Sequence, residues 1–179
     1  MRSTEKGVWL DQTPFFYIIK FEIGEGIQIL IVILYPNMSR IVAIDYGRKR
    51  TGIAVSDTLQ MIANGLTTVP THQLLTFILD YVAKEPVERI LVGLPKQMNN
   101  EVSENMKNIE PFVRTLKKRL PDIPIEYVDE RFTSVLAHRT MQEAGLKKKD
   151  RQNKALVDEI SATIILQTYL ENKRFNSNL

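Results

Sequence analysis

Apolar and polar positions alternate along the chain in blocks that predict three strands followed by helices and strands in turn. The apolar, β-branched run at 41–44 is typical of a buried strand, and 51–56 and 66–69 predict two more as antiparallel hairpins. Further short apolar runs at 89–93 and 123–128 predict two later strands. This order favours an α/β fold with a mixed five-stranded sheet flanked by helices.

Apolar residues that recur at three- and four-residue steps predict the helices between and after these strands. Thr71 is the expected N-cap of the first helix and Thr133 that of the third, which Gly145 ends. The predicted helices cover residues 71–82, 102–120, 134–144 and 155–172.

The first 37 residues differ from the rest of the chain. Residues 26–35 form a strongly apolar run, but charged residues precede it, and a membrane-spanning helix needs about 20 apolar residues. The lack of a small-residue cleavage pattern also disfavours a signal peptide. Two interpretations stay open: an extra strand or loosely attached segment, or a native start of translation at Met38. Both assign 1–37 to an N-terminal extension and 38–179 to the main domain, with no membrane anchor.

Composition limits the chemistry that the chain can perform. It has no cysteine and two histidines, which excludes disulfides, thiolate nucleophiles and cysteine- or histidine-rich metal sites and suits a reducing cytosol. Carboxylates would have to hold any catalytic metal, which favours Mg²⁺ or Mn²⁺. The net charge of +3 permits nucleic-acid binding without requiring it.

Asp45 ends the first predicted strand and opens the spacing Asp-x-Gly-x-x-x-x-Gly with Gly47 and Gly52. A carboxylate at the end of a buried strand is costly unless a partner or a metal compensates it, and Gly47 permits close approach of a ligand. The same carboxylate could instead bond the amides of its own turn. The spacing also matches the phosphate loop of actin-like kinases, so the motif alone leaves the function open.

Asp129, Glu130 and Arg131 directly follow the strand predicted at 123–128. Two carboxylates and a guanidinium at a strand end can hold a metal and contact a phosphate. The ordinary alternative is a surface ion pair beside a helix-start acid, which stabilises a protein little.

Asp158 lies on or beside the apolar face of the last predicted helix, where a carboxylate usually needs a partner. Its neighbour Glu159 points about 100° away, which favours solvent. An acid of the first helical turn, favoured by the helix dipole, is an equal alternative for Asp158. Together with Asp45 and the 129–130 pair, Asp158 supplies the separated carboxylates that two-metal phosphodiester hydrolysis requires.

Basic residues accompany the acidic positions. Cations beside Asp45 are poorly explained as solubilising surface charge, whereas a solvated loop remains the ordinary explanation for the run at 147–154. The candidate nucleic-acid contacts are Arg48, Lys49, Arg50, Arg131, Lys147, Lys148, Lys149, Arg151 and Lys154.

Four segments in order resemble the motifs of the YqgF family, also called RuvX, and the likeness extends over about Met38 to Phe175. The resemblance implies an RNase H-like fold related to Holliday junction resolvases, a bacterial cytoplasmic location and divalent-metal nuclease activity. It implies a substrate of branched DNA or the 5′ end of pre-16S ribosomal RNA. The segments are Ile44–Asp57 (IDYGRKRTGIAVSD), Val92–Pro95 (VGLP), Asp129–Ser134 (DERFTS) and Val157–Ala162 (VDEISA).

The family's acidic positions map to Asp45, the Asp129–Glu130 pair and Asp158 as catalytic candidates. Within the pair we favour Glu130, whose longer side chain can reach back to the strand end, so the expected metal ligands are Asp45, Glu130 and Asp158. Leu94 and the proline after it follow the fourth strand without the glutamate that resolvases of the wider fold carry nearby. Another residue would then have to supply the second metal site.

Three hypotheses follow. The leading one is a Mg²⁺-dependent endonuclease acting on structured RNA or DNA; a homodimer would match a two-fold symmetric junction. An actin-like phosphotransferase would need two lobes and a second phosphate loop, for which the chain is too short. A non-catalytic RNA-binding ribosome-assembly factor would keep the fold, and only an activity assay separates it from the first.

Overall fold

The computed structural model divides the chain into two compact units, Met1–Met38 and Ser39–Leu179. The residues that the structure describes are 3–8, 16–23, 27–34, 38–94, 105–129, 133–143, 145, 147, 149 and 152–177.

The described residues of the first unit form three strands where the sequence pattern predicted one at most. They are β1 (Ser3–Val8), β2 (Phe16–Ile23) and β3 (Ile27–Leu34), joined as an antiparallel meander in the order β1-β2-β3. The apolar run of the sequence therefore forms a strand paired with its neighbour, with Phe16 opposite Leu34 and Ile23 opposite Ile27.

The second unit is built on a five-stranded sheet in the order β6-β5-β4-β7-β8, which confirms the predicted mixed sheet. β6, β5 and β4 pair antiparallel, as a hairpin series must, while β4, β7 and β8 run parallel because helical segments connect them. All five predicted strands are present. They are β4 (Arg40–Tyr46), β5 (Arg50–Ser56), β6 (Ala63–Pro70), β7 (Val87–Leu94) and β8 (Ile125–Asp129).

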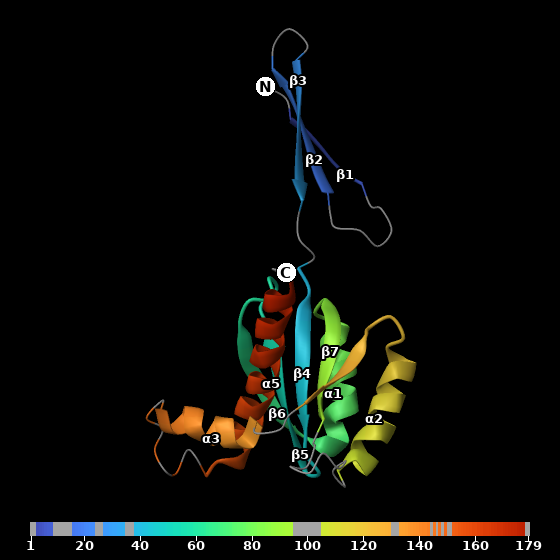
Figure 1. Ribbon diagram of the computed structural model, residues 1–179. Helices are drawn as coiled ribbons and strands as arrows, with labels where there is room; N and C mark the ends of the chain where they lie inside the picture. The colour runs from blue at the N-terminus through green and yellow to red at the C-terminus, as the bar shows by residue number, and fades with distance from the viewer. Residues whose placement is uncertain are drawn as a thin grey trace. The chain divides into compact units, whose positions relative to one another are not determined.

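Helices cover both faces of this sheet, with α1 and α2 on one side and α5 on the other (Figure 1). α3 packs beside α5. Among the described residues, no helix combines the length and apolar character needed to cross a membrane. The helices are α1 (Leu74–Val82), α2 (Met106–Arg119), α3 (Thr133–Glu143) and α5 (Lys154–Ser177), with a short 3₁₀ helix, η1 (Thr71–Gln73), before α1.

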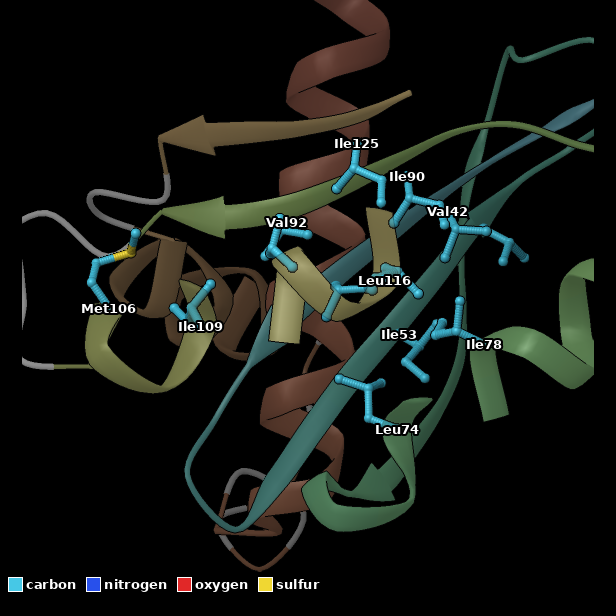
Figure 2. Close-up of a cluster of buried hydrophobic side chains, with 13 residues drawn as sticks. Val42, Ile53, Leu74, Ile78, Ile90, Val92, Met106, Ile109, Leu116 and Ile125 are labelled. Atoms are coloured by element: carbon cyan, nitrogen blue, oxygen red, sulfur yellow. The ribbon is translucent and has the colours of Figure 1, made fainter. Parts of the chain in front are cut away.

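Alternation along β4 divides the interior into two apolar cores, because successive side chains of a strand point to opposite faces. Val42 and Ile44 enter the core shared with α1 and α2, and Ile41 and Ala43 enter the core shared with α5. Figure 2 shows the first core. Its buried members are Val42, Ile44, Ile53, Val55, Leu74, Ile78, Ile90, Val92, Met106, Ile109, Val113, Leu116 and Ile125.

The helix boundaries correct two expectations. Thr71 is not an N-cap: α1 begins at Leu74 after the 3₁₀ turn, and its N-cap is Gln73, whose side chain makes no capping hydrogen bond. Thr133 is the first residue of α3 and lies inside the helix that it was expected to cap. The predicted start of α2 at position 102 lies outside the described residues.

From the position of the two cores we expect the second unit to fold stably without residues 1–37. Every residue of both cores lies between Ile41 and Leu170, so a chain that starts at Met38 keeps all of this buried apolar surface. We expect its thermal midpoint to lie within about 2 °C of that of the full chain, measured by circular dichroism. A markedly lower midpoint would show that residues 1–37 contribute to the stability of the main domain.

Candidate active site at the carboxyl end of β4

Asp45 lies near the carboxyl end of β4, on the face of the sheet that α5 covers. The strand alternation assigns it to this face together with Ile41 and Ala43, and it sits directly opposite Gly52 of β5. Its side chain is half-buried. The strand thus presents a carboxylate at the point where the apolar core against α5 gives way to solvent.

The helix α5 packs with its backbone directly on β5 at Gly52. A Cβ atom added at Gly52 would collide with the backbone carbonyl of Asp158 and come within 2.9 Å of the backbone nitrogen of Glu159. Any other residue here would hold the helix away from the sheet. Because Gly52 is the cross-strand partner of Asp45, this contact brings Asp158 next to Asp45.

Asp158 is held by an ion pair with Arg50, the first residue of β5. The guanidinium Nε of Arg50 donates to Oδ2 of Asp158 at 3.1 Å. Burial raises the pKa of Asp158, and the hydrogen bond and charge of Arg50, with the charge of Lys154, oppose that rise. The expectation that Asp158 lies on the packed side of the helix and has a partner is met, and it lies beyond the first helical turn, which holds no acid.

The pKa of Asp45 is raised from 3.8 to about 7, mainly by burial and also by the negative charge of Asp158, while a hydrogen bond from the Ser161 side chain opposes part of the rise. Asp45 therefore holds a proton near neutral pH unless a cation offsets the charge of the two carboxylates. Carboxylate oxygens are the ligands that Mg²⁺ and Mn²⁺ prefer, so this pair fits a divalent cation.

Among the described residues, no third carboxylate lies with Asp45 and Asp158 to form a three-ligand metal site. The register places Asp129 opposite Leu94 on the face of the sheet that holds Ile125 and the first core. That face is opposite to the one of Asp45, so Asp129 is not brought to Asp45. Glu130 lies outside the described residues.

The turn between β4 and β5 is held from both sides. The hydroxyl of Thr71 donates to the carbonyl oxygen of Gly47 at 2.7 Å, and the side-chain amide of Asn105 donates to the carbonyl oxygen of Tyr46 at 2.9 Å. Thr71 was expected to cap a helix, and its hydroxyl stabilises this turn instead. A Cβ atom at Gly47 would collide with the carbonyl of Arg50, so the tight turn requires glycine.

The cations suggested by the sequence fall into two groups. Arg50 pairs with Asp158, and Lys154, the first residue of α5, lies close enough to lower its pKa. Arg48 and Lys49 are exposed in the turn beside Asp45. Lys147 and Lys149 are exposed between α3 and α5, whereas Arg131, Lys148 and Arg151 lie outside the described residues.

A pocket opens at the same edge of the sheet, on the side of α2. Tyr46, Arg48 and Asn108 line it, and its volume is about 290 Å³. Tyr46 is held there by a tilted ring contact with Phe112, with centroids 5.3 Å apart. The carboxyl end of β4 therefore has this pocket on the face of the sheet toward α2, and Asp45 and Asp158 on the face toward α5.

The interpretation of a turn aspartate, left open for Asp45, describes Asp57 instead. Its carboxylate accepts the backbone N–H groups of Leu59, Met61 and Ile62 at 3.2, 2.6 and 2.7 Å. Desolvation opposes these bonds, yet they hold the pKa of Asp57 below its ordinary value. The last residue of the first motif thus stabilises the turn between β5 and β6.

Two residues of the last motif, Ser161 and Glu159, have environments that the sequence did not predict. Ser161 is 2% exposed and its side chain hydrogen-bonds to Asp45, a role that its spacing of three from Asp158 on one helix face could have suggested. Glu159 was expected in solvent. It is half-buried, and its side chain occupies the space that a Cβ atom at Gly65 would need.

The family model described as RuvX, Holliday junction resolvase, matches residues 39–172. The chain belongs to the RuvX family. This membership makes it a nuclease, and the RNase H-like arrangement expected from the motifs is confirmed by the mixed five-stranded sheet.

Curated relatives match nearly the whole of the RuvX region. A Bacteroides thetaiotaomicron protein named "Putative pre-16S rRNA nuclease" is 89% identical over 138 residues, which are 77% of this chain and 100% of that protein. A protein of the same name from Parabacteroides distasonis is 64% identical over 138 residues, 77% of this chain and 99% of its own. The solved structure of T. thermophilus RuvC in complex with Holliday junction substrate is similar with a TM-score of 0.48 and 16% identity, covering 76% of this chain and 96% of that one.

The contact at Gly52 yields a first test of the site. Gly52→Ala forces the backbone of α5 away from β5, so we expect a loss of about 1–3 kcal/mol in unfolding free energy and loss of nuclease activity as Asp158 moves. Urea denaturation and a cleavage assay measure both. The matched control is Gly65→Ala, where the added methyl meets the movable end of Glu159 and stability should change by less than about 0.5 kcal/mol. Equal effects of the two variants would contradict the role given to Gly52.

A second test uses the raised pKa of Asp45. Because its folded pKa of about 7 lies above the unfolded value of 3.8, its contribution to stability is fully present below about pH 4, is lost progressively as the pH rises from about 4 to about 7, and is absent above about 7. In metal-free protein, Asp45→Asn should increase the unfolding free energy at pH 8 by on the order of 2 kcal/mol relative to wild type, with little gain at pH 4. Asp80→Asn, an exposed change on α1, should keep the wild-type pH dependence. A pH dependence unaffected by Asp45→Asn would refute the assignment.

Proposed function

We propose that this RuvX-family nuclease is a divalent-metal-dependent endonuclease that matures the 5′ end of pre-16S ribosomal RNA in the cytoplasm. The observation that carries the proposal is the convergence of Asp45 and Asp158 in a partly desolvated position beside basic residues. Two neighbouring carboxylates that repel each other have little structural use, whereas a bound divalent cation removes the repulsion. The substrate is taken from the name of the relatives, one of which is 89% identical.

Three residues would hold the cation: Asp45, Asp158 and Glu130. The first two come from different elements that meet at Gly52, and the third follows the end of β8. When bound, Mg²⁺ or Mn²⁺ supplies Lewis-acid polarisation of the scissile phosphate and lowers the pKa of an attacking water. The hydrogen bond from Ser161 orients the Asp45 carboxylate and favours its ionised form.

Basic residues around the two carboxylates would bind the phosphodiester backbone. Arg48 and Lys49 are exposed in the β4–β5 turn, and Lys154 begins α5 on the side of Asp158. Contacts from Lys and Arg to phosphates make binding dependent on salt but carry no sequence information. Recognition of one cleavage position in a precursor RNA would therefore rest on the shape of the RNA.

Cleavage of branched DNA is the second candidate because the family description names Holliday junction resolvases. A metal site of carboxylates acts on RNA and DNA phosphodiesters alike. A side-by-side assay with precursor 16S RNA and a four-way DNA junction, each with Mg²⁺ or Mn²⁺, separates the two. We expect faster cleavage of the RNA.

The two carboxylates should be essential to that cleavage. Asp45→Asn and Asp158→Asn are each expected to reduce the rate by about 10²-fold or more, and the double variant little further, because the pair acts as a unit. Rates are measured under single-turnover conditions with excess enzyme.

The matched control is Asp80→Asn, which removes one exposed carboxylate on the opposite side of the sheet and should cleave at the wild-type rate. Undiminished cleavage by Asp45→Asn would identify a contaminating nuclease and overturn the proposal. Tight RNA binding by wild type without cleavage of either substrate would instead favour a non-catalytic assembly factor.

A further inference from the structure

Asp158 already forms an ion pair with a side chain of the same protein, Arg50. The Nε atom of Arg50 lies 3.1 Å from its Oδ2 atom, and the two side chains are 40% and 27% exposed. Alternation along β5 places Arg50 on the same face as Gly52 and Ala54, which is the face that α5 covers. The guanidinium thus lies on the same side of the sheet as Asp45 and Asp158.

The two carboxylates of the site have unequal partners. Asp158 is paired with a full positive charge, whereas Asp45 receives a hydrogen bond from the neutral Ser161 side chain. An ion pair this exposed is weak, since water competes for both groups and the long arginine side chain loses freedom in forming it. The pair therefore gives Asp158 a partner in the metal-free site and is weak enough to be exchanged.

A divalent cation between the two carboxylates would change this balance. It carries twice the charge of a guanidinium and bonds carboxylate oxygens directly, so it competes with Arg50 for Asp158. Once it is present, Arg50 lies beside a like charge and gains less from staying on Asp158.

We propose that Arg50 is the resident counter-cation of the metal-free site and that a divalent cation displaces it from Asp158. This inference rests on the proposed metal-dependent function. The displaced guanidinium remains at the start of β5, where its planar set of N–H donors matches the oxygens of a substrate phosphate. In the metal-free site Arg50 is a positioning residue that acts through Asp158. After the metal site is filled, its displaced guanidinium is available to a substrate phosphate.

Binding of Mn²⁺ alone tests the exchange without any nuclease assay. Full-length wild type, Arg50→Gln and Lys49→Gln are titrated with Mn²⁺, and free Mn²⁺ is followed by its electron paramagnetic resonance signal. Lys49→Gln is the matched control, because Lys49 is the adjacent exposed cation and the net charge changes equally. We expect Arg50→Gln to bind Mn²⁺ about three- to fivefold more tightly than Lys49→Gln, since no guanidinium competes for Asp158. Equal or weaker binding by Arg50→Gln would overturn the inference.

Thermal melting shows whether each variant folds and gives a second measurement. Metal-free Arg50→Gln should melt below Lys49→Gln, because Asp158 loses its partner beside Asp45, and saturating Mn²⁺ should raise its midpoint more. Arg50→Lys keeps a cation at this position and should bind Mn²⁺ within about twofold of wild type. Wild type that binds no Mn²⁺ contradicts the proposed function itself, whereas Mn²⁺ binding that is equal in Arg50→Gln and Lys49→Gln contradicts the role of Arg50 alone.

Discussion

The direct packing of the α5 backbone on β5 at Gly52 is the constraint on which the candidate site depends. A strand and a helix usually meet through side chains, which keep their backbones apart. Because Gly52 has no Cβ atom, the backbone of α5 packs directly on β5. Asp158 therefore lies beside Asp45, which is the cross-strand neighbour of Gly52. Two carboxylates from distant parts of the chain thus share one partly desolvated position.

That position works against the stability of the metal-free fold. Desolvation and the charge of Asp158 both raise the pKa of Asp45, which means that the folded state disfavours the ionised pair. The hydrogen bond from Ser161 and the charges of Arg50 and Lys154 offset part of this electrostatic cost. Burial of the two apolar cores on either side of β4 stabilises the fold against the remainder. A strained electrostatic site on a rigid sheet is what a preorganised cation-binding site requires.

The sequence predicts the elements of the main domain well because their signals are local. All five strands follow from short β-branched runs, and buried residues of α2 such as Ile109 and Leu116 follow from helical spacing. Local signals fail where a side chain has a distant partner. Thr71 was expected to cap its own helix, but its hydroxyl bonds to the carbonyl of Gly47, and Glu159, expected in solvent, packs over Gly65.

The sequence by itself determined the mixed sheet, the burial of its first strand at 41–44 and the identity of Asp45 and Asp158 as candidate acids. These features depend on periodicity and on motif residues that are close together in the chain. Only the tertiary structure decided that Arg50 pairs with Asp158, that Ser161 bonds to Asp45 and that Asp129 lies on the opposite face of the sheet from Asp45. The reason is physical: strand register and the close approach at Gly52 set which side chains meet, and neither is encoded in any one segment.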